Sequence, residues 1–193
     1  MIPTPDLSHL AAKDYEHVYE PAEDTFLLLD ALEEDEKALK NLRPIISLEI
    51  GSGSGCVSAF IGKILGPSVR ALLDLQPACP LRINTFPVYL CSDINPYACT
   101  CTRATGTQNK VVLDAINASF ASPLMARLQR AVDIILFNPP YVPTIPEEMN
   151  DAQDTRGISG SWAGGTNGMN VTDIFLEHVE VYSIYPGLLK PVC

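Results

Sequence analysis

The sequence is poor in basic residues. It contains 13 Lys and Arg against 23 Asp and Glu, so its formal net charge is −10 at pH 7. A surface that binds duplex nucleic acid through its phosphates needs the opposite balance of charge. The composition therefore disfavours an acidic partner and leaves a basic one open.

The chain also lacks the signals of a zinc site, of secretion and of membrane insertion. It has no Cys-x-x-Cys pair, and its nearest approach is Cys99-x-Cys101. The first 14 residues hold acids and prolines where a signal peptide needs a basic start and an apolar run. No apolar stretch is long enough for a membrane helix. We therefore expect no metal, no membrane association, and reduced structural thiols in a protein of the cytoplasm or the nucleus. The six cysteines are Cys56, Cys79, Cys91, Cys99, Cys101 and Cys193.

The remaining composition suits one globular domain. Of the 193 residues, 47% are hydrophobic and 19% are charged, which is enough apolar material for a core. Residues 1–17 are predicted to be a flexible N-terminal tail, and residues 18–193 to be the domain. At about residues 67–87 the apolar residues show neither helical nor strand periodicity, which predicts an inserted loop there.

Apolar runs alternate with helical patterns along the domain. We predict strands at residues 45–50, 88–92, 109–116 and 131–137. We predict helices at about residues 21–40, 56–65, 123–130 and 171–182, and a loop from residue 142 to 168. This alternation is typical of an α/β fold with a parallel, doubly wound sheet whose ligand lies at the carboxyl ends of the strands.

A glycine-rich turn follows the first predicted strand. Its glycines, Gly51, Gly53 and Gly55, lack the third glycine position of the dinucleotide fingerprint and the Gly-Lys-Ser/Thr of a phosphate loop. A turn without Cβ atoms lets an uncharged or zwitterionic ligand lie against the backbone, and Glu49 can accept a hydrogen bond from an ammonium group. The alternative is a tight βα turn with no ligand.

An acid ends the second predicted strand. Asp93 occupies the place where a nucleotide-binding βαβ unit binds a ribose diol. Asp93 could instead cap the following helix, and the two roles can coexist.

The last predicted strand ends in Phe-Asn-Pro-Pro-Tyr, residues 137–141. Pro139 biases Asn138 toward extended geometry and Pro140 does the same to Pro139, so an amide and two carbonyls are held in one orientation. Such a frame can accept hydrogen bonds from a planar NH₂ group, and Tyr141 offers a ring for stacking. A proline-rich turn without a ligand is the other interpretation.

With these motifs the chain resembles the HemK-like class I methyltransferases, which use S-adenosylmethionine. The resemblance covers most of residues 18–178 and implies a Rossmann-like parallel sheet flanked by helices. Residues 19–25, Tyr-Glu-Pro-Ala-Glu-Asp-Thr, look like the eukaryotic branch, which methylates the glutamine of a Gly-Gly-Gln motif in the class 1 translation termination factor. The other carriers are residues 48–55, 92–95, 137–141 and 162–168, the last being Trp-Ala-Gly-Gly-Thr-Asn-Gly.

The resemblance also implies roles for single residues. The Asn138 side chain and the Pro139 carbonyl would orient the substrate NH₂, with Pro140 and Tyr141 beside them. Ser119 and Phe120 stand where the family has an acid near the adenine. Methyl transfer would then depend on positioning, with no general base demanded. The implied cofactor-binding residues are Tyr19, Thr25, Glu49, Gly51, Gly53, Gly55, Asp93, Ile94, Ser119, Phe120 and Asn138.

The same resemblance implies a partner and an incomplete domain. A small zinc-binding activator protein would pair with the strand at residues 109–116, where Val111, Val112 and Leu113 give an apolar edge that would otherwise invite aggregation. The chain ends where residues 185–190 resemble the lead into a fifth strand, so the last strands of the family are expected to be missing.

Three other functions stay open at this stage. An adenine N6-methyltransferase could use the same motif to hold the exocyclic amine of a flipped base. A protein lysine methyltransferase is another candidate. The third is an inactive, truncated form that acts only as a binding protein.

Overall fold

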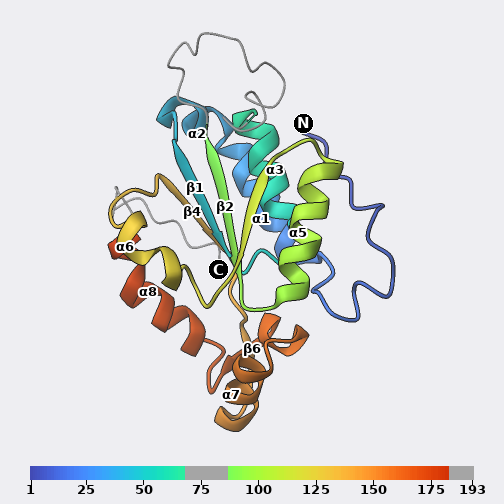
Figure 1. Ribbon diagram of the computed structural model, residues 1–193, viewed down its shortest axis with the longest axis vertical. Coiled ribbons are helices and arrows are strands. Elements are labelled where there is room, and N and C mark those ends of the chain that lie inside the picture. The colour runs from blue at the N-terminus through green and yellow to red at the C-terminus, as the bar shows by residue number, and fades with distance from the viewer. Residues whose placement is uncertain (68–86, 183–193) are drawn as a thin grey trace.

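The computed structural model describes residues 1–67 and 87–182, so the predicted insertion and the expected incomplete C-terminus lie mainly outside the described residues. Its main sheet is parallel and has the strand order β3-β2-β1-β4, which confirms the predicted α/β class (Figure 1). The strands are β1 (Ile46–Ile50), β2 (Val88–Asp93), β3 (Leu113–Asn117) and β4 (Ile134–Phe137).

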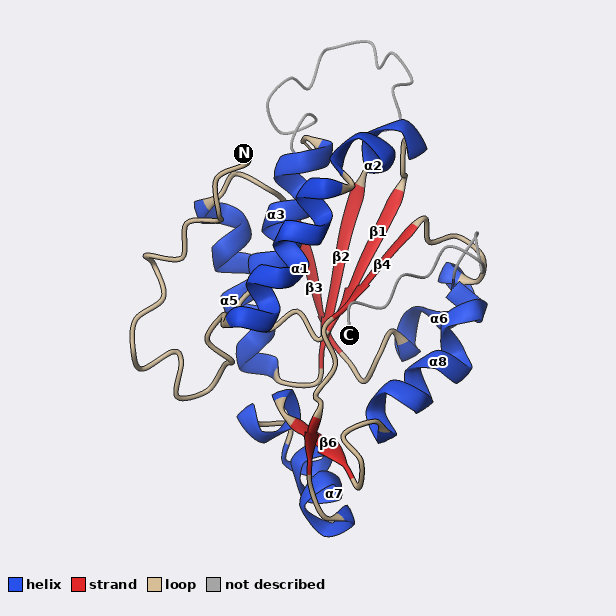
Figure 2. Ribbon diagram, turned by 180° about the vertical axis from the view of Figure 1, so that it is seen from behind, coloured by secondary structure: helices blue, strands red, loops and turns tan. Residues whose placement is uncertain are grey.

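Helices cover both faces of this sheet, as Figure 2 shows. On one face lie α1 (Glu23–Glu34), α2 (Glu36–Leu42), α3 (Cys56–Leu65) and α5 (Pro96–Gln108). On the other lie α6 (Met125–Leu128), which follows the short 3₁₀ helix η1 (Ser122–Leu124), and α8 (Asn170–Tyr182). This three-layer arrangement buries the strands on both sides, as a parallel sheet requires.

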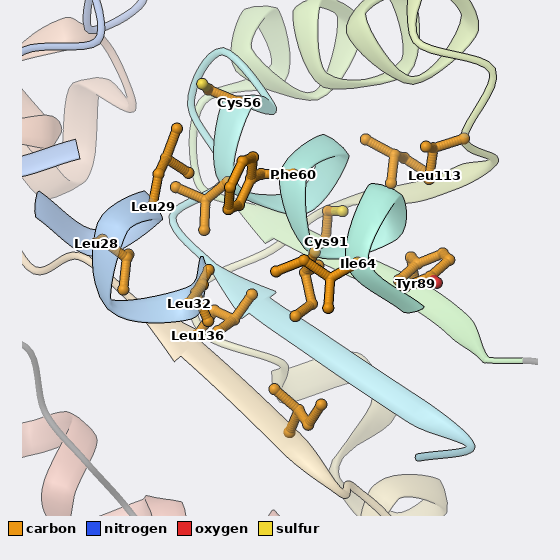
Figure 3. Packing of buried hydrophobic residues seen from close by; sticks show 14 residues of the cluster. Leu28, Leu29, Leu32, Cys56, Phe60, Ile64, Tyr89, Cys91, Leu113 and Leu136 are labelled. Carbon is orange, nitrogen blue, oxygen red and sulfur yellow. The ribbon is translucent and has the colours of Figure 1, made fainter. Parts of the chain in front are cut away.

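The two faces of the sheet follow from the alternation of side chains along each strand. On β4, Ile134 and Leu136 join the cluster made with α1 and α3, and Figure 3 shows Leu32 of α1 beside Leu136. The intervening Ile135 and Phe137 pack on the other side, against a cluster that includes Phe175 of α8. Because alternate residues of a strand point to opposite faces, a continuous apolar run serves two cores.

Four cysteines of the described residues, Cys56, Cys91, Cys99 and Cys101, are free and buried. Within residues 1–67 and 87–182, no helix has the length and apolar character to cross a membrane. Across the same residues, His, Cys, Asp and Glu form no cluster of three that could hold a metal ion.

The structure corrects several predicted boundaries. The helix predicted over about residues 21–40 is two helices, which meet at Asp35 with φ −83° and ψ 4°. The acidic residues at the end of α1 oppose its dipole, whereas Glu36 suits the first turn of α2. The third strand begins at Leu113 rather than at residue 109, because α5 continues to Gln108 and Lys110 turns the chain with φ 59°.

The loop predicted for residues 142–168 is wrong. This segment contains the short strands β5 (Val142–Pro143) and β6 (Ala163–Gly165), which pair with each other, and between them α7 (Pro146–Thr155) and η2 (Ile158–Ser161). It lies beyond the carboxyl ends of the main strands (Figure 1). The sequence carries a signal for α7, because Pro146 at the first helical position and Glu147 and Glu148 in the first turn are typical helix starts.

The N-terminal segment lies along the α5 side of the molecule. The Asp6 backbone N–H donates to Asn109 Oδ1 at 2.8 Å, and Tyr97 donates its hydroxyl to Asp14 Oδ1 at 2.6 Å. Leu10 packs against a small cluster that contains Val18 and Cys101. The flexibility of this tail stays a prediction, and the contacts show where the tail docks.

Candidate active site

A cavity opens where the carboxyl ends of β1, β2 and β4 meet. It is lined by the turn after β1, the end of β2, the residues that follow β3 and β4, the segment before α1, and parts of α7 and η2. In a doubly wound sheet this is the position at which ligands bind.

Most residues predicted for the site line this cavity. Gly55, Pro139 and Tyr141 are not among its lining residues. Tyr141 is 53% exposed. The predicted residues that do line the cavity are Tyr19, Thr25, Glu49, Gly51, Gly53, Asp93, Ile94, Ser119, Phe120, Asn138 and Pro140.

The glycine turn after β1 is shaped by left-handed backbone. Gly51 and Gly53 have φ of 72° and 51°, and a Cβ built on either would meet nothing within 4 Å. Their open side is the cavity that they line, so these two glycines leave room for a ligand against the backbone. Gly55 has another function, because its Cβ would lie 2.8 Å from the Thr102 backbone of α5. It permits close packing of α5.

Asp93 ties this turn to the end of β2. Its Oδ2 accepts from the Gly53 backbone N–H and its Oδ1 from the Asn95 backbone N–H, both at 2.9 Å. Burial raises the pKa of the Asp93 carboxyl, while these two hydrogen bonds oppose the rise. The suggestion that Asp93 caps the next helix is wrong, because Asn95 is the N-cap of α5 and accepts from the Tyr97 N–H at 2.9 Å.

Glu49 is a buried acid on the face of β1 that meets α3. Its side chain is 4% exposed and accepts a hydrogen bond from the Ser58 hydroxyl. Burial raises the pKa of Glu49 to about 8, and the nearby Asp93 adds to the rise while Ser58 opposes it. Among the described residues no Lys, Arg or His forms an ion pair with it. Glu49 is thus a buried acid at a cavity wall with no cation of the described chain beside it.

Asn138 stands directly after β4 and is held from the side of α1. Its Nδ2 donates to Asp24 Oδ2 at 2.9 Å, across 114 positions of sequence. Asp24 also accepts from the Tyr19 hydroxyl at 3.0 Å. Burial, followed by this hydrogen bond, raises the pKa of Tyr19 to about 12. The Asn138 amide is therefore held by Asp24, in addition to the restriction that the two prolines place on the backbone.

Ser119 and Phe120, which follow β3, form a further part of the cavity wall. Phe120 has a positive φ of 49°, which is uncommon for a residue with a side chain, and its ring stacks on Phe175 of α8 with centroids 6.4 Å apart. This aromatic contact holds the cavity-lining residues Ser119 and Phe120 against the second core cluster.

Sequence reasoning missed two parts of the site. One is the set of cavity-lining residues on α7 and η2, among them Gln153 and Ser161, which follows from the missed helix. The other is the role of the glycines in residues 162–168. A Cβ at Gly164 would lie 2.7 Å from the Pro140 carbonyl oxygen, and one at Gly168 would lie 2.2 Å from that of Tyr141. These glycines let β6 and the turn after it press on the backbone of the Asn-Pro-Pro-Tyr segment.

Comparison with known proteins gives several relatives along almost the whole chain. Methyltransferase HEMK2 of Mus musculus is 42% identical over 190 residues, which cover 98% of this chain and 75% of that protein. Methyltransferase HEMK2 of Homo sapiens is 40% identical over 188 residues, covering 97% of this chain and 74% of that protein. The eRF1 methyltransferase catalytic subunit mtq2 of Schizosaccharomyces pombe is 38% identical over 188 residues, which cover 93% of this chain and 74% of that protein. No protein-family model matches the chain.

Proposed function

The chain belongs to the HEMK2 family of methyltransferases, and we propose that it methylates the side-chain amide of a glutamine in the translation termination factor eRF1, with S-adenosylmethionine as methyl donor. The observation that carries this proposal is the meeting of three features at one cavity. These are the open glycine turn at Gly51 and Gly53, the carboxylate of Asp93 and the amide of Asn138. The first two suit a nucleoside with an amino-acid tail, and the third suits an acceptor amide.

The donor set of the cavity fits S-adenosylmethionine. We assign the ribose hydroxyls to Asp93, the amino-acid part to the turn at Gly51 and Gly53, and the ammonium group to Glu49. Tyr19, Thr25, Ile94, Ser119 and Phe120 supply further walls. When bound, S-adenosylmethionine supplies an electrophilic methyl group on a sulfonium sulfur.

The task of the chain's own residues is to hold the acceptor amide. We assign to the Asn138 side chain and the Pro139 carbonyl the acceptance of hydrogen bonds from the glutamine NH₂, with Pro140 and Tyr141 beside it. An oriented nitrogen close to the methyl carbon removes much of the entropic barrier of a bimolecular reaction. The exposed ring of Tyr141 is available to pack on the incoming polypeptide.

The charge near the cavity favours a protein substrate over a nucleic acid. The helix α7, which contributes to the cavity lining, carries four exposed acids, Glu147, Glu148, Asp151 and Asp154. Phosphates approaching this helix would be repelled.

The test is methyl transfer from labelled S-adenosylmethionine to eRF1, to eRF1 with the glutamine of its Gly-Gly-Gln motif replaced, and to DNA. We expect label in eRF1 and none in the glutamine variant or the DNA. Label in DNA and not in protein would replace the proposal with an adenine N6-methyltransferase. Label in the glutamine variant at lysine would replace it with a lysine methyltransferase.

Binding of the donor is expected to release a proton from Glu49. With a pKa of about 8, the buried carboxyl is mostly protonated near neutral pH, and a bound ammonium group would favour its charged form. Affinity should therefore rise with pH up to about 8 and then level off. Calorimetry with S-adenosylhomocysteine in buffers of different ionisation enthalpy measures the released protons. A release near zero in the wild-type protein would contradict the assignment.

Two variants make this measurement specific. Glu49→Gln should release fewer protons than the wild-type protein, whereas Glu34→Gln, at an exposed acid of α1, should behave like the wild type. The unliganded protein gives a second readout. Because the folded pKa of Glu49 lies above the ordinary 4.5, its contribution to stability is full below about pH 4.5 and is lost as pH rises through about 8. The melting temperature of the wild type should fall relative to that of Glu49→Gln across that window.

A partner subunit is also part of the proposal, because the fission yeast relative is described as a catalytic subunit. We assign the outer edge of β3, which among the described strands pairs with β2 alone, to a small zinc-binding activator protein, which would add a strand there. The predicted apolar character of this edge needs correction, since Val111 and Leu113 are 7% and 6% exposed and lie in the core. The proposed pairing would use the backbone groups of this outer strand rather than apolar side chains.

Coexpression with the activator is therefore expected to raise the soluble yield of the chain. The two proteins should copurify through size exclusion at one-to-one stoichiometry, while an unrelated small zinc protein should give no gain. A monodisperse, fully soluble monomer that does not bind the activator would contradict this assignment.

A further inference from the structure

Asp24 is the second residue of α1 and lies at the cavity wall, half-buried. Both of its carboxylate oxygens are engaged. Oδ2 accepts from Asn138 Nδ2 at 2.9 Å, and Oδ1 accepts from the Tyr19 hydroxyl at 3.0 Å. The Thr25 hydroxyl lies 3.5 Å from the same Oδ1. Three side chains from two distant parts of the sequence thus converge on one acid.

The contact with Asn138 has only one workable orientation. A carboxamide carries two donors on its nitrogen and an acceptor on its oxygen, whereas an ionised carboxylate only accepts. If the Asn138 amide were rotated by half a turn, Oδ1 would face Asp24 Oδ2 at the present 2.9 Å, and two acceptors would oppose each other. The charge-assisted bond would be lost as well. Asp24 therefore determines that the nitrogen branch of the Asn138 amide faces it and that the oxygen branch points away.

We propose that Asp24 is the positioning residue that presents Asn138 Oδ1 to the substrate. By binding Nδ2, it leaves the oxygen branch of the amide to accept from the glutamine NH₂. This inference rests on the proposed function, since it concerns the orientation of the same acceptor site. Asp24 acts through Asn138 and does not itself touch the substrate, so it is not a catalytic residue.

Tyr19 supports this arrangement from the other side. Its hydroxyl donates to the oxygen of Asp24 that Asn138 does not use, which limits rotation of the carboxylate. The raised pKa of Tyr19 keeps that hydroxyl protonated throughout the physiological range. Tyr19 and Asp24 therefore act on the amide of Asn138 as well as lining the cavity.

A purely structural role for Asp24 would consist of stabilising the start of α1, by capping it or by interacting with the helix dipole. The N-cap of α1 is Ala22, which makes no side-chain cap, and the hydrogen bonds of the Asp24 side chain go to other side chains. An acid in a first turn does favour the helix dipole, but Glu23 shares that turn and is exposed. Glu23→Gln is thus the matched control, because it removes the same charge from the same turn.

The first test compares steady-state kinetics of Asp24→Asn and Glu23→Gln on eRF1. We expect kcat to fall at least about tenfold in Asp24→Asn, because an amide at position 24 can face either branch of Asn138. The affinity for S-adenosylhomocysteine and the melting temperature should stay near the wild-type values, and Glu23→Gln should be unchanged in all respects. Retention of kcat within about threefold in Asp24→Asn would overturn the proposal.

The second test exchanges the two groups. Asn138→Asp alone places two carboxylates together and should be nearly inactive. In the double variant Asp24→Asn/Asn138→Asp, the new amide donates to the new carboxylate, whose other oxygen can still accept from the substrate. We expect the double variant to exceed Asn138→Asp at least about tenfold in kcat. A double variant no better than Asn138→Asp would overturn the proposal.

A spectroscopic readout separates this inference from the proposed function. The side-chain ¹H–¹⁵N signals of Asn138, assigned with Asn138→Ala, should move in Asp24→Asn and stay in place in Glu23→Gln. Unmoved signals would overturn the inference whatever the substrate proves to be. A wild-type protein that fails to methylate eRF1 would overturn the proposed function alone.

Discussion

Replacing Asn138 by alanine is expected to remove nearly all methyl transfer in a preparation where the wild-type protein is active. The change deletes the acceptor to which we assign the orientation of the substrate NH₂, and oriented polar groups in dry sites contribute about 3 kcal/mol or more to the barrier. That corresponds to a loss of at least about a hundredfold in turnover. Single-turnover assays on eRF1 measure it directly.

The structure adds a secondary effect of the same variant. Asp24 loses its partner at 2.9 Å and keeps Tyr19, so a carboxylate remains at the cavity wall with one acceptor group open. Affinity for S-adenosylhomocysteine should change much less than turnover does. Asn41→Ala, at an exposed position in α2, is the matched control and should behave as wild type. Residual activity of Asn138→Ala within about tenfold of the wild type would remove Asn138 from its assigned role.

Replacing Asp93 by alanine is expected to abolish binding of S-adenosylhomocysteine in calorimetry. The carboxylate is the group assigned to the ribose hydroxyls, and a site that loses such a partner leaves buried polar groups unpaired. The variant also loses the two hydrogen bonds to the Gly53 and Asn95 backbone N–H groups, so the glycine turn loses its tie to β2. Some loss of stability, about 1–3 kcal/mol, should accompany the loss of binding.

Asp133 offers a control for that loss of stability. Its Oδ2 accepts from the Ile45 and Ile46 backbone N–H groups at 2.7 and 2.9 Å, at the opposite end of β1 from the cavity. Asp133→Ala therefore removes two comparable backbone contacts and should lower the melting temperature while leaving the affinity for S-adenosylhomocysteine intact. If Asp93→Ala still bound with wild-type affinity, Asp93 would only be a clamp for the turn.

The sequence was sufficient for the main sheet and for the positions of most site residues. Short continuous apolar runs that alternate with helical patterns are strong signals of this fold class, and α3 begins at Cys56 and ends at Leu65 as predicted. The carboxyl ends of parallel strands share one edge, so Gly51, Asp93 and Asn138 could be expected together from topology alone.

Other parts of the site depend on contacts that no local pattern encodes. Asp24 looks like an ordinary first-turn acid, and its contact with Asn138 exists only because α1 packs beside β4. Gly164 and Gly168 look like loop glycines until the Pro140 and Tyr141 carbonyls are placed against them. Tyr141 is 53% exposed and lies outside the cavity lining, so stacking of its ring on a substrate stays a prediction.

The position of β4 in the sheet bears on how the protein is made. Among the described strands β4 pairs with β1 alone, so β1, β2 and β3 can associate before β4 has left the ribosome. That earlier unit already contains Gly51, Gly53 and Asp93, whereas the contact between Asp24 and Asn138 closes later in synthesis. A nascent chain would thus acquire the part of the site that we assign to the nucleoside before the part that we assign to the acceptor amide. Small molecules bound to that first unit would favour its folding by mass action.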